Sequence, residues 1–472
     1  MPKPLTNTVG APIETRTIEQ VPLHERHGKA WHLAPFWFAG NFVLTTLAVG
    51  FIGPSMSLPA LTAIMAIFIG VGLGTLCMAL HANQGPRLGL AQMIQSRAQF
   101  GVKGAILPFA AVLLVYIGFN VFNLILAGEV LSQVLDGPTA LWQLLVLLVA
   151  VAIAIVGHDL LHTVQRWLTY VLIAVFAVLS FTAVDTLQLG AMQHEPTFSW
   201  PAFLSQLSAA AAYQISYAVY VSDYSRYLPA DTPARRVIGW TYLGAAASAL
   251  WLMSLGALLA SSITIDDPIN TLRVLGDRFS PGFGTFAILV TVPALVGIMA
   301  VNCYGAMLTG ATAISAIRPT NSGVGTRVAG IGVIACLIYL AVILLPAGYL
   351  DSFNLFLQLM LYFLMPWSAI NLIDFYLLRK GQYLVAALFD SQGIYGRWAW
   401  PGMLAYLGAL VAMVPFASLG SLEGWVVVKM GGVNLAFLVG FIAAAGLYVA
   451  LTRKRDRLCQ ASASDAHQEH HA

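Results

Sequence analysis

Apolar residues recur along this chain in runs of about twenty, separated by short segments rich in Gly, Pro and charge. A run of that length forms a helix that crosses the roughly 30 Å hydrocarbon core of a bilayer. The pattern therefore predicts twelve membrane-spanning helices with short connections. We expect them at residues 33–55, 60–80, 105–134, 140–157, 163–184, 203–222, 238–261, 284–316, 328–345, 351–377, 400–417 and 431–451.

Composition favours a membrane protein over a soluble one. Of the 472 residues, 59% are hydrophobic and 9% charged, whereas soluble domains carry roughly 25% charged residues. The polar first 30 residues lack the apolar core of a signal peptide, so we expect no cleaved leader. The four cysteines are scattered without metal-ligand spacing, and we expect neither a disulfide nor a zinc site.

Positive charges predict the orientation of the helices, because cytoplasmic loops retain Lys and Arg. With a cytoplasmic N-terminus and twelve spans, 20 of the 23 Lys and Arg residues fall on the cytoplasmic side. The other three are Arg273, Arg278 and Lys429. We therefore expect an inner (plasma) membrane protein with cytoplasmic tails at residues 1–32 and 452–472, the second of them disordered.

The first predicted helix contains a weak point. Gly40 and Asn41 lie in the middle of the span and Thr45 and Thr46 follow, so helix propensity falls where the bilayer is deepest. Transporters use such interrupted helices to bind substrates and ions near the membrane midplane, and we assign Gly40 and Asn41 to a substrate site. The alternative is a packing notch of small residues, which is common in membrane helices.

Three further spans carry aromatic and amide side chains at depth. Tyr116 and Asn120 share one face of the third span. Tyr213 and Gln214 lie in the sixth span, and Asn302 lies in the eighth. Such amides can serve only as hydrogen-bonding contacts between helices. An aromatic face beside an amide also suits a planar base, which stacks through its face and hydrogen-bonds through its edge.

Acidic residues are scarce inside the predicted spans, and Glu129, Asp159 and Asp374 lie near helix ends. An uncharged lining favours a neutral substrate over a carboxylate, a phosphate or a polyamine. The chain has no HExxH or GxSxG motif, so we do not expect an intramembrane enzyme. A passive channel stays open as an alternative, and nucleic acid is not an expected partner.

Four longer motifs point to a family. They are QGPRLGL at residues 84–90, QSRAQFG at 95–101, VSDYSRYLP at 221–229 and PWSAINLIDFY at 366–376. In these motifs the chain resembles the nucleobase:cation symporter-1 family, particularly its purine and cytosine permease-like branch. The resemblance implies the leucine-transporter fold, with inverted five-helix repeats at residues 33–184 and 203–377 and two more helices at 400–451.

The resemblance also implies roles for individual residues. The family's third helix supplies a stacking aromatic and an amide, matched by Tyr116 and Asn120, where relatives commonly have Trp and Gln. The shorter Asn would favour a different base or a shifted pose. The sixth helix supplies a second stacking aromatic, which is Tyr213 or, with a shift of one residue, Gln214. We prefer Tyr213 because only it can stack.

Sodium-coupled relatives bind the ion with backbone carbonyls of the first helix and hydroxyls of the eighth. The carbonyl positions correspond to Ala39 and Phe42, and the hydroxyl positions to Ala300 and Val301. Two lost hydroxyls would leave a hard cation under-coordinated, so we expect proton coupling. The proton carrier stays open among the three acids named above.

The sequence thus predicts a secondary active transporter that imports a neutral purine or cytosine-type nucleobase, with a proton, by alternating access. The alternative is a sodium-coupled or uncoupled transporter of another heterocycle, such as a hydantoin, allantoin, a pyridine or a thiamine precursor. We expect no cofactor, and the expected partners are the small-molecule substrate and the lipid bilayer. No feature of the sequence indicates an oligomeric state.

Overall fold

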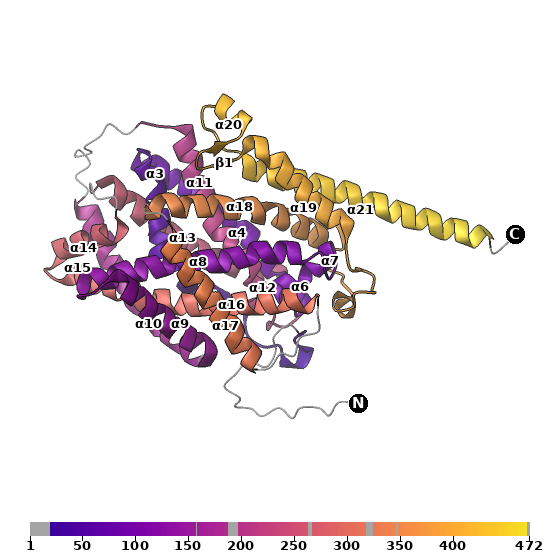
Figure 1. The fold of residues 1–472 in the computed structure, drawn as a ribbon, viewed down its shortest axis with the longest axis horizontal. Coiled ribbons are helices and arrows are strands. Elements are labelled where there is room, and N and C mark those ends of the chain that lie inside the picture. Colours follow the sequence, from indigo (N-terminus) through magenta and orange to yellow (C-terminus); the bar gives the residue numbers. More distant parts are fainter. Residues whose placement is uncertain are drawn as a thin grey trace.

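The computed structural model describes residues 19–156, 158–186, 197–262, 267–317, 324–345 and 348–469. In this part of the chain, helices pack into one bundle (Figure 1), and the strands β1 (Ser418–Leu419) and β2 (Leu422–Glu423) form a short antiparallel hairpin. The helices are α1 Leu33–Asn41, α2 Leu44–Val49, α3 Ile52–Ser55, α4 Ala60–Ala82, α5 Gln84–Leu88, α6 Gln92–Gln95, α7 Arg97–Phe100, α8 Ile106–Val134, α9 Thr139–Val156, α10 His158–Thr186, α11 Trp200–Ile215, α12 Val221–Ser225, α13 Ala234–Ser262, α14 Pro268–Phe279, α15 Phe283–Leu289, α16 Thr291–Ser315, α17 Val324–Leu344, α18 Tyr349–Ile373, α19 Trp400–Met413, α20 Trp425–Lys429 and α21 Ala436–Glu469.

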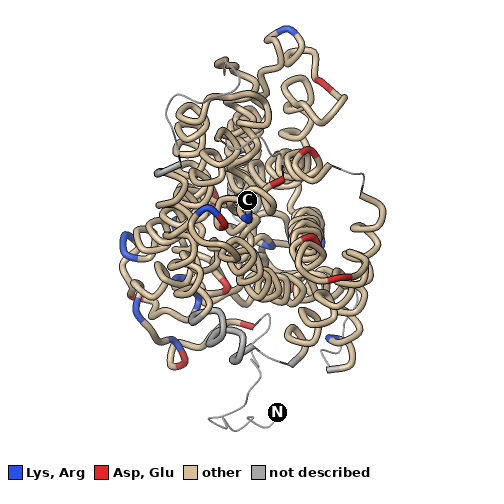
Figure 2. The backbone as a smooth tube through the Cα atoms, turned by 90° about the vertical axis from the view of Figure 1, so that its left-hand side faces the viewer, with Lys and Arg blue, Asp and Glu red and all other residues tan. Residues whose placement is uncertain are grey.

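Each predicted span coincides with one or more of these helices. Seven helices of the described residues are long and apolar enough to cross a bilayer, and the bent pair Ala30–Asn41 and Leu44–Ser55 makes an eighth. Shorter apolar helices at Thr139–Ile155, Leu168–Val184 and Trp400–Phe416 cover three further spans, and α11 covers the sixth. Charged residues are sparse along the bundle (Figure 2). The all-α membrane class is confirmed, while the total of twelve spans stays a prediction.

The first span is broken where the sequence predicts a weak point. α1 ends at Asn41, Phe42 leaves the helical conformation (φ −86°, ψ 64°), and the chain bends by 70° before α2 continues. Side chains satisfy the freed carbonyl groups: Thr46 Oγ1 donates to the carbonyl oxygen of Asn41 at 2.6 Å, and Tyr217 Oη donates to that of Gly40 at 3.3 Å. The break is therefore a stable part of the fold.

A second break interrupts the sixth span without Gly or Pro. α11 ends at Ile215, the 3-10 turn η3 (Ser216–Val219) follows, and Tyr220 (φ −140°, ψ 6°) separates it from α12. Tyr213 and Gln214, the polar residues that the sequence places in this span, both stay in α11. The four alanines at 209–212 favour helix, so the chain departs from α-helix only after them.

Glycines allow the backbones of several helices to approach closely. A methyl group at Gly70 of α4 would lie 2.2 Å from the carbonyl oxygen of Leu207 on α11, and one at Gly74 would lie 2.4 Å from that of Ala211. Gly50, just after α2, would meet a carbonyl oxygen of α13 at 2.0 Å. Small-residue contacts of this kind are typical of membrane helices, and they hold both broken spans against α4 and α13.

Of the helices that lie where the hydrophobic pattern predicts loops, α14 is the longest. α14 follows the seventh span, and the Asp267 side chain caps it by accepting hydrogen bonds from the backbone N–H groups of Ile269 (3.0 Å) and Asn270 (3.3 Å). Pro268 occupies its first turn. These residues are a recognisable start signal, but a helix of 12 residues is too short to read as a span.

The C-terminal tail differs from the expectation of disorder. α21 runs from the last span to Glu469 and projects from the bundle (Figure 1). No Gly or Pro follows Gly446, and the segment contains several Ala, Arg, Lys and Gln residues. These residues favour helix, so a helix already anchored in the bundle extends into the tail.

Candidate functional site

An amide cluster joins α8 to α16 near the midpoint of both helices. Asn120 is fully buried, and its Nδ2 donates to the carbonyl oxygen of Met299 at 3.1 Å and to Cys303 Sγ at 3.2 Å. Its Oδ1 accepts a hydrogen bond from Asn302 Nδ2 at 3.1 Å. The structure thus brings together two of the amides that the sequence assigned to the substrate site.

A second amide pair lies at the first break. Asn41 Nδ2 donates to Gln214 Oε1 at 3.3 Å and to the carbonyl oxygen of Ala245 at 2.9 Å. Among the described residues, Asn41 Oδ1 and Gln214 Nε2 are buried and have no hydrogen-bond partner. An unpaired buried polar atom costs about 1–3 kcal/mol. One free acceptor and one free donor on adjacent amides are therefore a candidate contact for the edge of a ligand.

Two tyrosines provide nearly parallel aromatic faces. Tyr116 on α8 and Tyr220 at the second break have ring centroids 5.7 Å apart and an interplanar angle of 22°. Tyr213, which the sequence favoured as the partner of Tyr116, instead meets Phe119 edge-on at 5.3 Å, and its hydroxyl is hydrogen-bonded with Thr46 Oγ1 at 2.8 Å. The stacking role of Tyr213 stays a prediction, and Tyr220 is a candidate that sequence reasoning missed.

A small cavity lies beside the first break. It is lined by residues of α1 and the break, of α10 and of α16, namely Ala39, Gly40, Phe42, Val43, Leu168, Thr169, Leu172, Ala294 and Ile298. Gly40 also faces open space, since a methyl group there would have no neighbour within 4 Å. Thr169 supplies the one hydroxyl group among the nine lining residues.

The residues that the sequence assigned to a cation differ in whether they line this cavity. Ala39 and Phe42 line the cavity, whereas Ala300 and Val301 are not in its lining. The α16 residues that do line it, Ala294 and Ile298, have no side-chain oxygen. The eighth span therefore offers no hydroxyl ligand at either pair of positions.

Comparison with known proteins decides the family. Residues 20–440 match the family described as permeases for cytosine/purines, uracil, thiamine and allantoin. The chain belongs to this family. Its membership confirms the resemblance to nucleobase:cation symporters that the four motifs indicated, and it makes the protein a membrane transporter and not an enzyme.

Two relatives share this permease's sequence. It is 37% identical to YxlA of Bacillus subtilis (strain 168), provisionally named a purine-cytosine permease, over 94% of this chain and 96% of that protein. It is 27% identical to the purine-cytosine permease fcyB of Emericella nidulans, over 63% of this chain and 61% of that protein.

A solved structure shares the fold of the permease. Mhp1, a nucleobase-cation-symport-1 family transporter, has been solved in a closed conformation with bromovinylhydantoin bound. It superposes with a TM-score of 0.73 and 19% identity, covering 94% of this chain and 96% of Mhp1. The expected leucine-transporter fold is confirmed by this likeness.

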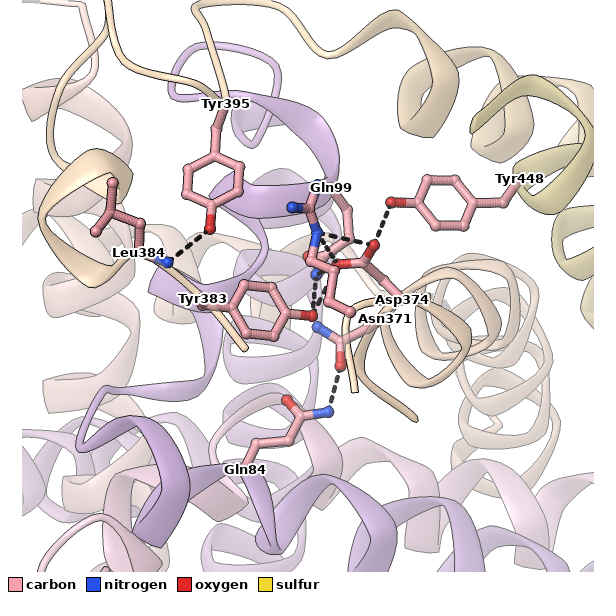
Figure 3. A network of polar contacts seen from close by, with 9 residues as sticks. Gln84, Gln99, Asn371, Asp374, Tyr383, Leu384, Tyr395 and Tyr448 are labelled. Carbon is pink, nitrogen blue, oxygen red and sulfur yellow. Dashed lines mark hydrogen bonds and ion pairs between the residues drawn. The ribbon is translucent and has the colours of Figure 1, made fainter. Parts of the chain in front are cut away.

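A different polar cluster lies at the end of α18 (Figure 3). Asp374 begins a π-helical turn (η4, Asp374–Leu378) and is fully buried. Its carboxylate accepts hydrogen bonds from Gln99 Nε2 (2.7 Å), Tyr383 Oη (2.7 Å) and Tyr448 Oη (2.8 Å) and pairs with Arg379 Nε at 3.0 Å. This Asp374 cluster ties the end of α18 to α7, to the loop after α18 and to α21.

The groups around Asp374 favour one another's protonation states. Burial would lower the pKa of Arg379, but the adjacent Asp374 carboxylate raises it above its ordinary value. Burial, and then the same carboxylate, raises the pKa of Tyr383, so this tyrosine stays protonated and donates. The Arg379 guanidinium also lies over the rings of Tyr383 (5.6 Å) and Tyr395 (5.0 Å), an arrangement that favours the cation.

The three acids considered as proton carriers differ in their surroundings. Asp374 has a counter-charge and several donors, as described above. Glu129 is half-buried on α8. The side chain of Asp159 lies outside the described part of the structure.

Proposed function

We propose that this permease imports a neutral purine or cytosine-type nucleobase together with a proton by alternating access. The observation that carries the proposal is the amide pair at the first break, where Asn41 Oδ1 and Gln214 Nε2 are buried and have no partner in the part of the chain that the structure describes. An acceptor beside a donor complements the donor and acceptor groups on the edge of a base. The named lining residues are uncharged, which suits a neutral ligand.

The rings and the second amide pair support the same class of substrate. Tyr116 and Tyr220 offer faces on which a planar heterocycle can stack. Asn120 and Asn302 are hydrogen-bonded to each other. A second edge of the base could replace this hydrogen bond with its own bonds to the two amides. The relatives are named purine-cytosine permeases, which agrees with a site made of aromatic and amide side chains.

A hydantoin is the second candidate substrate. The Mhp1 structure has bromovinylhydantoin bound, and a hydantoin ring also alternates N–H and C=O groups along its edge. A ligand that binds only the folded protein raises its melting temperature. We expect adenine or cytosine to give a larger shift than hydantoin or allantoin with the purified permease. A larger shift with a hydantoin than with any base would reassign the substrate.

Proton coupling is supported by the cavity beside the first break, because α16 presents no side-chain oxygen there and hard cations need oxygen ligands. Permease reconstituted in liposomes should accumulate radiolabelled cytosine or adenine when a pH gradient is imposed. A protonophore should abolish accumulation, and replacing sodium with choline should not. Sodium-dependent, protonophore-resistant accumulation would overturn the coupling, and equilibration without accumulation would indicate a channel.

The orientation belongs to the same proposal. The excess of Lys and Arg on one side, 20 of 23 residues, supports cytoplasmic N- and C-termini in the plasma membrane. Protease-sensitive tags at both ends should resist protease added to intact cells and be cleaved once the cells are opened. Cleavage of either tag in intact cells would refute this topology.

A further inference from the structure

We propose that Gly305 on α16 is a specificity-determining residue, because its missing side chain fixes the position of the Tyr116 ring and hence the space for a base. The inference rests on the proposed function, since it takes Tyr116 as a stacking surface. Gly305 itself need not touch the substrate. It acts by leaving room for a residue that does.

The geometry shows how little room there is. A methyl group at Gly305 would lie 2.7 Å from Cζ, 2.8 Å from Oη and 2.9 Å from Cε1 of Tyr116, whereas carbon atoms in contact lie about 3.5–4.0 Å apart. Cζ is bonded to both of the other atoms, so a point nearest to Cζ lies over the face of the ring and not beyond its edge. The present position of Tyr116 is therefore incompatible with any larger residue at 305.

The fold can tolerate this conflict. All three of the nearest atoms belong to the free end of the Tyr116 side chain. At Gly70 and Gly74, by contrast, the first obstacle is a backbone carbonyl oxygen of α11. Alanine at position 305 can be accommodated by turning one ring, without separating α16 from α8. The change should therefore alter binding more than folding.

A displaced Tyr116 ring changes the space beside Tyr220. The two ring centroids are 5.7 Å apart, and a base inserted between them needs roughly 7 Å, which is two contacts of about 3.5 Å. The ring must already move when a base enters. A methyl group that restricts this movement should penalise a bicyclic purine, which overlaps more of the ring, more than a monocyclic cytosine.

Binding of adenine and cytosine to purified Gly305→Ala tests the proposal. We expect the Kd for adenine to rise roughly tenfold, within the range found when a base-stacking contact is lost, and the Kd for cytosine to change less than about threefold. Gly310→Ala is the matched control, because a methyl group at Gly310, on the same helix, would have no neighbour within 4 Å. Wild-type affinity of Gly305→Ala for both bases, or equal losses for both, would overturn the proposal.

A double variant tests the contact itself. If Gly305→Ala lowers the melting temperature of the ligand-free permease, the loss should vanish when Tyr116→Leu removes the ring, because only coupled residues show such non-additivity. A loss that persists in Tyr116→Leu would place the conflict elsewhere and overturn the proposal. If the wild-type permease binds neither base, the proposed function fails. The melting temperatures of the single and double variants still show whether Gly305 and Tyr116 are in contact.

Discussion

The central amide site and the Asp374 cluster both bury polar groups between helices, but they differ in charge and in completeness. At the centre, neutral amides leave Asn41 Oδ1 and Gln214 Nε2 without partners among the described residues. At the end of α18, one carboxylate has a counter-charge and several donors. A free acceptor beside a free donor marks a place where a ligand can complete the hydrogen bonds, whereas a buried carboxylate with both oxygens paired holds the fold together.

The largest expected effect is on stability, from Asp374→Ala. The change leaves Arg379 without its counter-charge and the three other donors without their acceptor. Breaking a buried pair costs about 3–5 kcal/mol, and we expect the lower end because Arg379 is 23% exposed. Thermal unfolding in detergent measures the loss. Asp351→Ala, an exposed residue on the same helix, should be nearly neutral, and equal melting temperatures for the two variants would contradict the structural role of Asp374.

At the centre the effect should fall on binding instead. Asn120→Ala should weaken nucleobase binding by roughly a hundredfold, or about 2.7 kcal/mol, in a protein that still folds, although Asn302 Nδ2 loses its acceptor. Asn354→Ala serves as the control, because Asn354 lies on α18 and donates to Ser205 Oγ at 3.1 Å. Unchanged affinity in Asn120→Ala would mean that the amide only joins α8 to α16.

A smaller difference should separate the two tyrosines. Tyr220→Ala removes the ring that lies parallel to Tyr116 and should weaken binding by roughly tenfold, because stacking on a base is worth about 1–3 kcal/mol. Tyr213→Phe keeps the edge-on contact with Phe119 and loses the hydroxyl that hydrogen-bonds to Thr46 and Tyr217, so we expect a change below about threefold. Equilibrium binding of labelled base measures both. A larger loss from Tyr213→Phe would favour the original assignment of Tyr213.

The smallest effect concerns pH and the Asp374 cluster. Folding raises the pKa of Tyr383. The protonated Tyr383 hydroxyl therefore stabilises the folded protein fully at pH values below the ordinary tyrosine pKa of about 10, and this contribution to the free energy of unfolding is lost as the pH rises above it. The contribution of this tyrosine should fall by at most about 1.4 kcal/mol per pH unit. Melting temperatures between pH 7 and 11 should decline less steeply in Tyr383→Phe. A steeper decline in that variant would reverse the sign of this linkage.

The sequence predicted features that depend on local chemistry. Gly40 and Asn41 marked the first break because their low helix propensity acts where they stand. Asn120 and Asn302 could be assigned to one site because each is an amide in the middle of an apolar span. α14 also has a local start signal, Asp267 followed by Pro268, but its 12 residues are too few to form a long apolar run.

Features set by tertiary contacts were not predictable in this way. The second break has no Gly or Pro, and its position after Ile215 decides that Tyr220, and not Tyr213, faces Tyr116. The Asp374 cluster joins residues as far apart in sequence as Gln99 and Tyr448. No local pattern reports such pairings, because they exist only once the helices have packed.

Gly70 and Gly74 let α4 and α11 pack so closely that the two helices form one rigid unit. Backbones in such close contact cannot slide past one another, because a carbonyl oxygen of one helix would clash with a Cα atom of the other. The contact also leaves no room for lipid or water between the two helices. Gly50 fastens the first broken span to α13 in the same manner. We therefore expect α4 and α11 to move together, so that a change of conformation alters other contacts, such as that between the Tyr116 and Tyr220 rings.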